Sequence, residues 1–230
     1  MPKPKILCLH GGGANARIME AQTARLGLII RKHFDLVFLD APIECEAGPG
    51  ILPVFEGEEP FRRWHEDAHA AAKGTAHARQ MERVRQLLLG AIRQQGPFVG
   101  VLGFSQGAKT AMQLLLLQEE RPQDVGGIKF GVFTCGTVPP EDLLFAQRGG
   151  EGEAEAETQR PATVRVPTLH VIGDADPWRL ESEKLPEFCD AATRRVFPFK
   201  GGHHFPAIAA ENQKMADLIL EVYREAEGRA

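Results

Sequence analysis

The chain has 230 residues, of which 43% are hydrophobic and 25% charged, and its formal net charge is −4. This length and hydrophobic content predict one α/β domain over residues 1–230, and the slight negative charge excludes the basic surface typical of nucleic-acid-binding proteins. No stretch approaches the roughly 18 consecutive apolar residues of a membrane-spanning helix.

Two further features predict a cytoplasmic protein. Residues 1–5 carry no apolar signal-peptide region before the first expected strand. The cysteines are scattered without C-x-x-C pairs, which favours free thiols in a reducing compartment. The four are Cys8, Cys45, Cys135 and Cys189.

The first expected strand runs from Lys5 to Leu9 and leads into a run of His10 and three glycines. This HGGG-type loop can present backbone N–H groups to an oxyanion. The alternative is a phosphate-binding loop, but the run lacks both the P-loop and the dinucleotide-fold spacings. The donor amide, if the loop serves an oxyanion, is that of Gly12 or Gly13.

The second expected strand, residues 36–39, is followed by a long excursion over residues 43–78. We expect this insertion to act as a cap over the substrate pocket. Phe61 and Trp64 are its bulkiest apolar residues, and we predict that they contact the substrate. The alternative is that these aromatic side chains pack the insertion onto the body of the domain.

The same excursion contains a zinc-like motif, H-E-x-x-H, at His65–His69. The extended zinc-protease form fails, because Ala72 and Thr75 occupy its Gly and third His positions. The flanking residues are also polar, unlike the surroundings of a buried metal helix. We therefore expect no metal site here.

The next elements surround a candidate nucleophile. Residues 98–102 form a short apolar run typical of a buried parallel strand, and helical spacing of apolar residues resumes from Ala108. Between them, residues 103–107 match G-x-S-x-G, the turn that exposes the nucleophilic serine of α/β-hydrolases. The alternative is an ordinary turn, but the strand and the helix on either side favour Ser105 as a nucleophile.

Two further helices are expected from apolar residues at helical spacing. The first precedes the serine turn and has Met81, Val84, Leu87, Leu88, Ala91 and Ile92 on its apolar face. The second lies near the end of the chain and has Met215, Leu218, Ile219 and Val222.

A fourth strand is expected at residues 130–135, followed by an acidic, low-complexity segment at 149–157. We expect residues 147–161 to form a mobile, solvated loop without function, the alternative being a docking site for a partner.

Two more strands, at residues 168–172 and 195–199, each end in a loop with polar side chains. Asp174 and Asp176 follow the first strand, and His203 and His204 follow the second. The order Ser, acid, His is that of an α/β-hydrolase triad, and open α/β sheets carry their chemistry at such strand ends. Spacing alone leaves both pairs open, and a carboxylate here could simply cap the helix expected near residue 178.

Five ordered motifs resemble the FSH family of small serine hydrolases, which includes polyketide-releasing thioesterases and esterases of fungal biosynthetic clusters. The motifs are Leu9–Gly12, Leu39–Pro42, Gly103–Ala108, Gly173–Trp178 and Gly201–Pro206. This resemblance implies that Asp176 is the triad acid and His203 the base, with the Gln106 amide as one oxyanion donor. The run of three glycines departs from many relatives, which leaves the second donor open between Gly12 and Gly13. Trp178 and Phe205 lie within these motifs, and we predict that they also contact substrate.

We therefore expect an α/β-hydrolase fold: a mostly parallel sheet with helices on both faces and a cap-like insertion after the second strand. The predicted function is hydrolysis of an ester or thioester of a medium-to-large acyl group, free or bound to a carrier as a polyketide, through Ser105, His203 and Asp176. No metal, organic cofactor or nucleic acid is expected to take part. The alternatives are a general carboxylesterase or acyl-protein thioesterase, whose Gly-Phe-Ser-Gln-Gly motif is similar, and a non-hydrolytic ligand-binding protein on the same scaffold. Three retained triad residues argue against the last.

Overall fold

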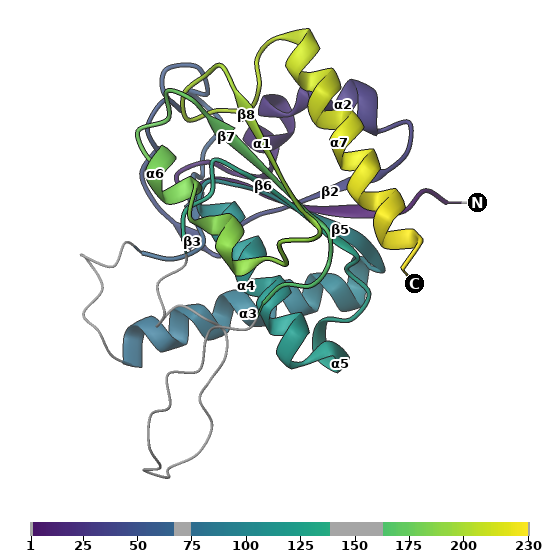
Figure 1. Ribbon diagram of the computed structural model, residues 1–230. Helices are drawn as coiled ribbons and strands as arrows, with labels where there is room; N and C mark the ends of the chain where they lie inside the picture. Colours follow the sequence, from purple (N-terminus) through teal and green to yellow (C-terminus); the bar gives the residue numbers. More distant parts are fainter. Residues whose placement is uncertain (1, 67–74, 139–162, 230) are drawn as a thin grey trace.

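The computed structural model describes residues 2–66, 75–138 and 163–229 (Figure 1). Its centre is a six-stranded sheet in the order β2-β1-β5-β6-β7-β8, with every neighbouring pair parallel. A separate antiparallel pair joins β3 to β4. The strands are β1 (Lys5–Leu9), β2 (Asp35–Leu39), β3 (Ile43–Glu44), β4 (Arg62–Arg63), β5 (Phe98–Phe104), β6 (Phe130–Thr134), β7 (Thr168–Gly173) and β8 (Arg194–Phe199).

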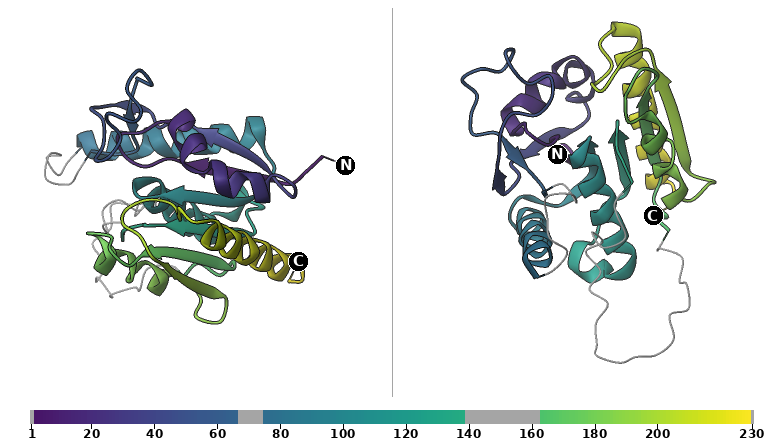
Figure 2. Two further views of the ribbon diagram at one scale, coloured as in Figure 1. Left: turned by 90° about the horizontal axis from the view of Figure 1, so that it is seen from above. Right: turned by 90° about the vertical axis from the view of Figure 1, so that its left-hand side faces the viewer.

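Helices cover both faces of the sheet (Figures 1 and 2). One face packs against α3 and α4, and the other against α2 and α7. Successive strand residues alternate between the two cores because side chains of a strand point to opposite faces: Leu7 and Leu9 belong to the first core, Ile6 and Cys8 to the second. The helices are α1 (Ala16–Gln22), α2 (Ala24–Ile30), α3 (Thr75–Gln95), α4 (Gln106–Glu120), α5 (Pro122–Val125), α6 (Arg179–Ser182) and α7 (Ala209–Glu227), with a 3-10 helix, η2 (Leu185–Phe188).

The parallel sheet with helices on both faces confirms the fold expected from the sequence. All six expected strands are present, and the one before the candidate nucleophile continues to Phe104, two residues beyond its apolar run. No element is expected from the sequence at residues 16–30, where the structure has α1 and α2. The signal was available, because Asn15 caps α1 by accepting a hydrogen bond from the Ile18 amide at 2.9 Å, and asparagine is a preferred N-cap residue.

Residues 43–66 of the excursion lie against the loop that follows β1, and residues 75–78 form the start of α3. The Gly13 amide donates to the Arg62 carbonyl at 2.9 Å, and the Gly48 amide donates to the Gly13 carbonyl at 2.9 Å. A small apolar cluster of Ala14, Ile18, Ile51 and Phe61 fills the space beneath. The segment is thus tied to the glycine loop through its backbone.

Two expectations concern residues that the structure leaves partly or wholly undescribed. The acidic loop at 147–161 lies outside the described residues, as do residues 67–69 of the zinc-like motif. Among the helices of the described ranges, none is both long and apolar enough to cross a bilayer. All four cysteines lie in described ranges, and each is a free thiol.

Candidate active site

Ser105 lies at the turn between β5 and α4, in the backbone conformation of a nucleophile elbow. Its φ of 52° falls in the left-handed region that L-residues rarely adopt. Its amide donates to the carbonyl of Thr134, the last residue of the neighbouring strand β6, at 2.9 Å. This bond fixes the turn at the carboxyl end of the strands. Strain of this kind costs about 1–3 kcal/mol and persists where the surroundings over-determine it, typically at functional sites.

The two glycines of the motif are required by close backbone approaches. A Cβ on Gly103 would fall against the backbone of Gly107 and Ala108. A Cβ on Gly107 would fall against the carbonyl oxygens of Leu9 and His10, at the end of β1. The glycines therefore let the helix after the nucleophile approach the loop after β1.

The structure brings Ser105, His203 and Asp176 together in one hydrogen-bonded chain. His203 Nε2 lies 2.8 Å from Ser105 Oγ, and His203 Nδ1 lies 2.9 Å from Asp176 Oδ2. A carboxylate can only accept, so Nδ1 carries the proton and the neutral ring accepts from the Ser105 hydroxyl at Nε2. The Asp176 side chain is fully buried, and its Oδ1 also accepts from the Trp178 amide at 2.8 Å. Asp176 thus both caps the following turn and orients the imidazole.

The other candidates of each pair lie elsewhere. Asp174 is exposed to solvent. His204 is also exposed: its Nδ1 lies 2.7 Å from the Phe205 carbonyl, and its Nε2 accepts from the Gly202 amide at 3.1 Å. The geometry favours Asp176 and His203 as the partners of Ser105.

The glycine loop after β1 lies beside the start of α4. The Gly13 amide is engaged by Arg62, as described above. Gly12 lies next to Gln106, since a Cβ placed on it would approach Gln106 Oε1 to 3.3 Å. Gln106 is the first residue of α4, where a backbone amide has no partner within the helix. The amides of Gly12 and Gln106 are therefore the candidates for binding a negative oxygen near Ser105.

His10 holds the glycine loop in place, a role that was not expected from the sequence. Its ring is fully buried, with Nδ1 2.7 Å from the Gly11 carbonyl and Nε2 accepting from the Ala41 amide at 3.0 Å. Burial lowers the pKa of His10 to about 4, so the ring is neutral near pH 7. The neutral ring ties the loop after β1 to the loop after β2.

The four predicted substrate contacts divide into buried and exposed residues. Phe61 and Trp64 are 6% and 0% exposed, which favours the alternative that they pack the excursion onto the body. Phe205 is also buried, with its ring 5.0 Å from that of Phe104. Trp178 is 44% exposed, and its indole stands edge-on to the His203 ring at 4.6 Å.

Trp64 and Gln106 make a link that the sequence pattern did not reveal. Trp64 Nε1 donates to the His10 carbonyl at 2.8 Å, and its amide donates to Gln106 Oε1 at 2.7 Å. Gln106 Nε2 in turn donates to the His65 carbonyl at 2.9 Å. One segment of the excursion is thus attached to His10, which precedes the glycine run, and to the side chain of Gln106.

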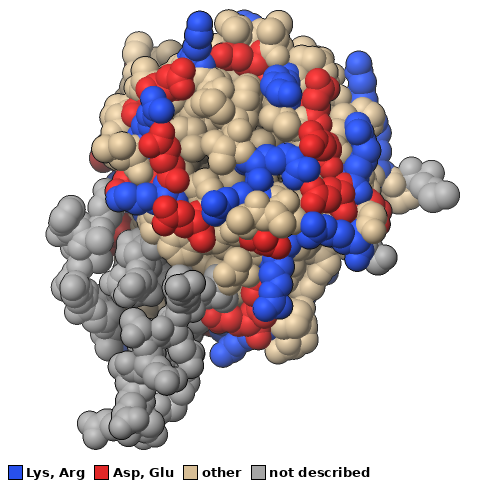
Figure 3. Space-filling view, viewed as in Figure 1, with Lys and Arg blue, Asp and Glu red and all other residues tan. Residues whose placement is uncertain are grey.

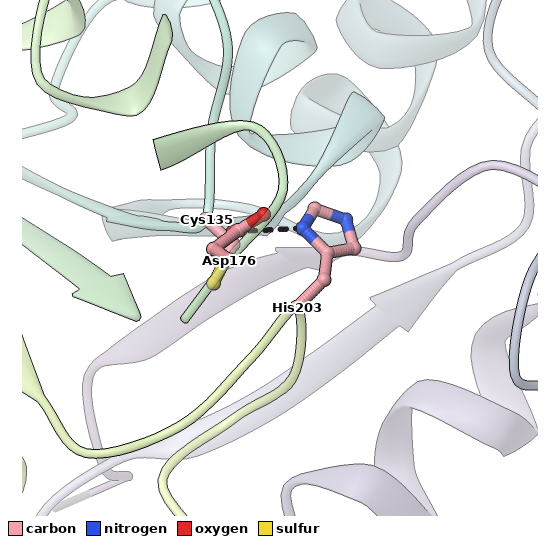
Figure 4. Close-up of side chains that lie close together, drawn as sticks. All are labelled: Cys135, Asp176 and His203. Carbon is pink, nitrogen blue, oxygen red and sulfur yellow. Dashed lines mark hydrogen bonds and ion pairs between the residues drawn. The ribbon is translucent and has the colours of Figure 1, made fainter. Parts of the chain in front are cut away.

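Among the described residues, one group has three possible metal-ligating atoms within 4.8 Å of one another: Cys135, Asp176 and His203 (Figure 4). Burial raises the pKa of the Cys135 thiol, and the nearby Asp176 carboxylate raises it further. A metal binds the thiolate, so a raised thiol pKa disfavours metal binding at this group. The arrangement therefore suits hydrogen bonding better than metal binding. Cys135 follows a strand end, the same signal that selected the triad candidates.

Charges are mixed on the face drawn in Figure 3. Lys and Arg side chains alternate with Asp and Glu there, without a patch of one sign over the described residues of this face. Elsewhere in the described chain, ion pairs join opposite charges at the surface, such as Arg179 and Glu183. A nucleic-acid backbone would require a concentration of positive charge.

Comparisons with known proteins agree with the geometry. Residues 1–215 match the family described as Serine hydrolase (FSH1). The chain is 38% identical over 223 residues to Esterase FUS5 of Gibberella fujikuroi, covering 96% of this chain and 88% of that protein. It is 30% identical over 237 residues to Thioesterase FSL2 of Gibberella zeae, covering 97% and 94%.

A solved structure supports the fold. The acyl-protein thioesterase 2 of Zea mays superposes with a TM-score of 0.63 at 17% identity, covering 97% of this chain and 95% of that one. Identity at this level supports only the likeness of fold, whereas the family match extends over most of the sequence. The chain belongs to the FSH1 family of serine hydrolases and is an enzyme of the esterase and thioesterase class.

Proposed function

We propose that the protein hydrolyses an ester or thioester of a medium-to-large acyl group, with Ser105 as nucleophile, His203 as general base and Asp176 as the residue that orients the base. The observation that carries this proposal is the chain of two hydrogen bonds, 2.8 and 2.9 Å long, from Ser105 Oγ through the imidazole to the buried carboxylate. A serine hydroxyl is a weak nucleophile until an adjacent base removes its proton.

In the first half of the reaction, Ser105 Oγ attacks the acyl carbonyl while His203 Nε2 takes the hydroxyl proton. The imidazolium that forms is stabilised by Asp176, which remains ionised. The carbonyl oxygen becomes negative and accepts from the amides of Gly12 and Gln106. Removing such a donor from a serine hydrolase costs roughly 3–4 kcal/mol of transition-state stabilisation. Gly13 is disfavoured as a donor because its amide already binds the Arg62 carbonyl.

In the second half, His203 gives its proton to the leaving alcohol or thiol. It then takes a proton from water as the water attacks the acyl-enzyme, and it returns that proton to Ser105 Oγ as the acid product leaves. Every proton transfer uses a group of this chain, so we expect activity to withstand chelating agents.

The acyl group is expected to lie against Trp178. This side chain is half-exposed, touches the ring of His203 and is followed closely by Leu180, which is 75% exposed. Apolar surface beside the reacting carbonyl is what a pocket needs to select large acyl groups. The resemblance to polyketide-releasing enzymes suggests a carrier-bound polyketide as the substrate. Some relatives are named esterases and others thioesterases, so experiment must distinguish an alcohol from a thiol as the leaving group.

Covalent labelling tests the nucleophile directly. Wild-type protein should react with a fluorophosphonate probe, and Ser105→Ala should not, while keeping the wild-type circular dichroism spectrum. The same variant should lower kcat on an activated ester by roughly 10⁴-fold or more. A variant that retains a tenth of the wild-type rate would contradict the assignment.

A matched pair of substrate series tests the specificity. We expect kcat/KM to rise with acyl length for both p-nitrophenyl esters and N-acetylcysteamine thioesters. Trp178→Ala should lower kcat/KM for the longest acyl groups by about tenfold, or ~1.4 kcal/mol, and spare the acetyl ester. A preference for S-acylated peptides over both series would instead indicate an acyl-protein thioesterase.

A further inference from the structure

The two candidate oxyanion donors belong to different elements of the fold. The Gly12 amide lies in the loop after β1, whereas the Gln106 amide is at the start of α4. Donors of an oxyanion hole stabilise the transition state only when each lies about 2.7–3.1 Å from the same oxygen. The distance between the two amides must therefore be fixed by a part of the chain that contacts both elements.

Residues 62–65 of the excursion make contacts of this kind. On one side they are bonded to the loop after β1 at two places. The Arg62 carbonyl accepts from the Gly13 amide at 2.9 Å, and Trp64 Nε1 donates to the His10 carbonyl at 2.8 Å. These two bonds lie on either side of Gly12 along the loop, so they fix the position of its amide.

The side chain of Gln106 binds the same segment from the other side, through both atoms of its amide group. Its Oε1 accepts from the Trp64 amide at 2.7 Å, and its Nε2 donates to the His65 carbonyl at 2.9 Å. Trp64 and His65 are 0% and 3% exposed, so the backbone groups that Gln106 binds lie away from solvent, where a lost hydrogen bond is costly. A carboxamide suits this place because it offers an acceptor and a donor side by side.

We infer that the Gln106 side chain positions the two oxyanion donors relative to each other, a role which rests on the proposed function. It holds residues 64–65 against the start of α4, while the same segment is bonded to the loop after β1 at His10 and Gly13. The distance between the Gly12 and Gln106 amides is fixed in this way. The backbone amide of Gln106 remains after substitution of the side chain, so the positioning can be tested without removing a donor.

The same helix provides a matched control. Gln118, near the other end of α4, binds the backbone of Ile128 in the same manner: its Nε2 donates to the carbonyl at 2.8 Å, and its Oε1 accepts from the amide at 3.1 Å. Methionine is about as long as glutamine but has no donor and only a weak acceptor. Gln106→Met and Gln118→Met therefore each remove one carboxamide–backbone contact of the same kind from the same helix.

The measurement uses an alkyl trifluoromethyl ketone as a transition-state analogue. Ser105 Oγ adds to its carbonyl carbon while His203 takes the hydroxyl proton, and the carbonyl oxygen becomes an oxyanion. Gln106→Met should weaken inhibitor binding about tenfold and lower kcat by a similar factor, with KM within about twofold of wild type, because misplaced donors stabilise the oxyanion poorly but hardly affect the bound substrate. Gln118→Met should lower Tm and leave inhibitor binding and kcat unchanged.

Wild-type inhibitor binding and kcat in Gln106→Met would overturn the inference. An equal loss in Gln118→Met would also overturn it, because general loosening of α4 would then explain both. Should Gln106→Met fail to fold, Trp64→Phe tests the same segment, since it keeps an aromatic ring and removes the indole bond to the His10 carbonyl. It should show the same parallel loss, and wild-type values would again overturn the inference. A wild-type protein that no fluorophosphonate labels would instead refute the proposed function itself.

Discussion

At the scale of single residues, two pairs of neighbours with the same chemistry have different surroundings. Asp176 and His203 are bonded to each other, and His203 also contacts Ser105, whereas Asp174 and His204 are exposed. Each pair therefore provides its own control. The substitution made at Asp176 can be repeated two positions away at Asp174, and the one made at His203 can be repeated at the next residue, His204.

Asp176→Asn and His203→Ala should each lower kcat by roughly 10³–10⁴-fold, since the first removes the partner that fixes the ring tautomer and the second removes the base. Asp174→Asn and His204→Ala should stay within a few-fold of wild type. Steady-state hydrolysis of an activated ester, with circular dichroism to check folding, measures both. A reversed order within either pair would show that the neighbouring residue performs the chemistry.

At the scale of elements, the site depends on how closely α4 approaches the loop after β1. Gly107→Ala would place a methyl group against the Leu9 and His10 carbonyl oxygens, and backbone cannot yield as a flexible side chain can. We expect a loss of about 1–3 kcal/mol in the free energy of unfolding, together with lower activity. Urea unfolding measures the first.

Gly90→Ala is the matched control for this substitution. Gly90 lies within α3 and has nothing within 4 Å of an added Cβ. The change should raise the free energy of unfolding by about 0.5–1 kcal/mol, because alanine loses less conformational freedom in a helix. Equal effects of the two substitutions would mean that the approach of α4 to β1 is not tight.

The excursion is a second element whose role can be separated into packing and specificity. Trp64 is fully buried and bonded to the His10 carbonyl and to Gln106. Trp64→Ala should cost about 3–5 kcal/mol in stability and lower kcat/KM equally for short and long acyl groups. Trp178→Ala should discriminate between them. A selective loss on long acyl groups in Trp64→Ala, with an unchanged Tm, would restore Trp64 as a substrate contact.

At the scale of the whole molecule, buried histidines should make stability depend on pH. Burial lowers the pKa of His10 to about 4. It also lowers that of His170 on β7 to about 3, where the charge of Arg194 adds to the effect. Their ordinary value is 6.5. Below that pH the two histidines bind protons in the unfolded chain but not in the folded chain. The free energy of unfolding therefore decreases as the pH is lowered.

We expect this loss to begin near pH 6.5 and to continue to about pH 4 for His10 and pH 3 for His170, with His10 alone contributing about 3 kcal/mol. Urea unfolding between pH 7.5 and 4.5 should show it. His170→Phe should flatten the slope of stability against pH, because phenylalanine cannot bind a proton. The substituted ring can keep the packing that His170 makes with Phe133, at 5.0 Å between ring centroids. His33→Gln, at an exposed position, should leave the slope unchanged. An unchanged slope in His170→Phe would contradict the buried neutral state.

Much of this fold could be predicted from the sequence because its signals are local. Apolar runs between turn residues predict strands, the spacing of Met81 to Ile92 predicts α3, and the glycines around Ser105 predict a strained turn. Alternation of strands and helices then predicts a parallel sheet with strand ends at one edge. The order of the polar residues along the chain predicts a triad at that edge.

The remaining features depend on contacts between distant segments, which no local pattern encodes. His203 meets Ser105 across 98 positions, and spacing along the chain could not separate it from His204 without the loop geometry or the family resemblance. The engagement of the Gly13 amide by Arg62, 49 positions away by numbering, distinguishes it from Gly12. Sequence determined which residue types could perform the chemistry and at which end of the sheet. Tertiary structure decided which of them touch, because hydrogen bonds act over about 3 Å in space, whatever the separation along the chain.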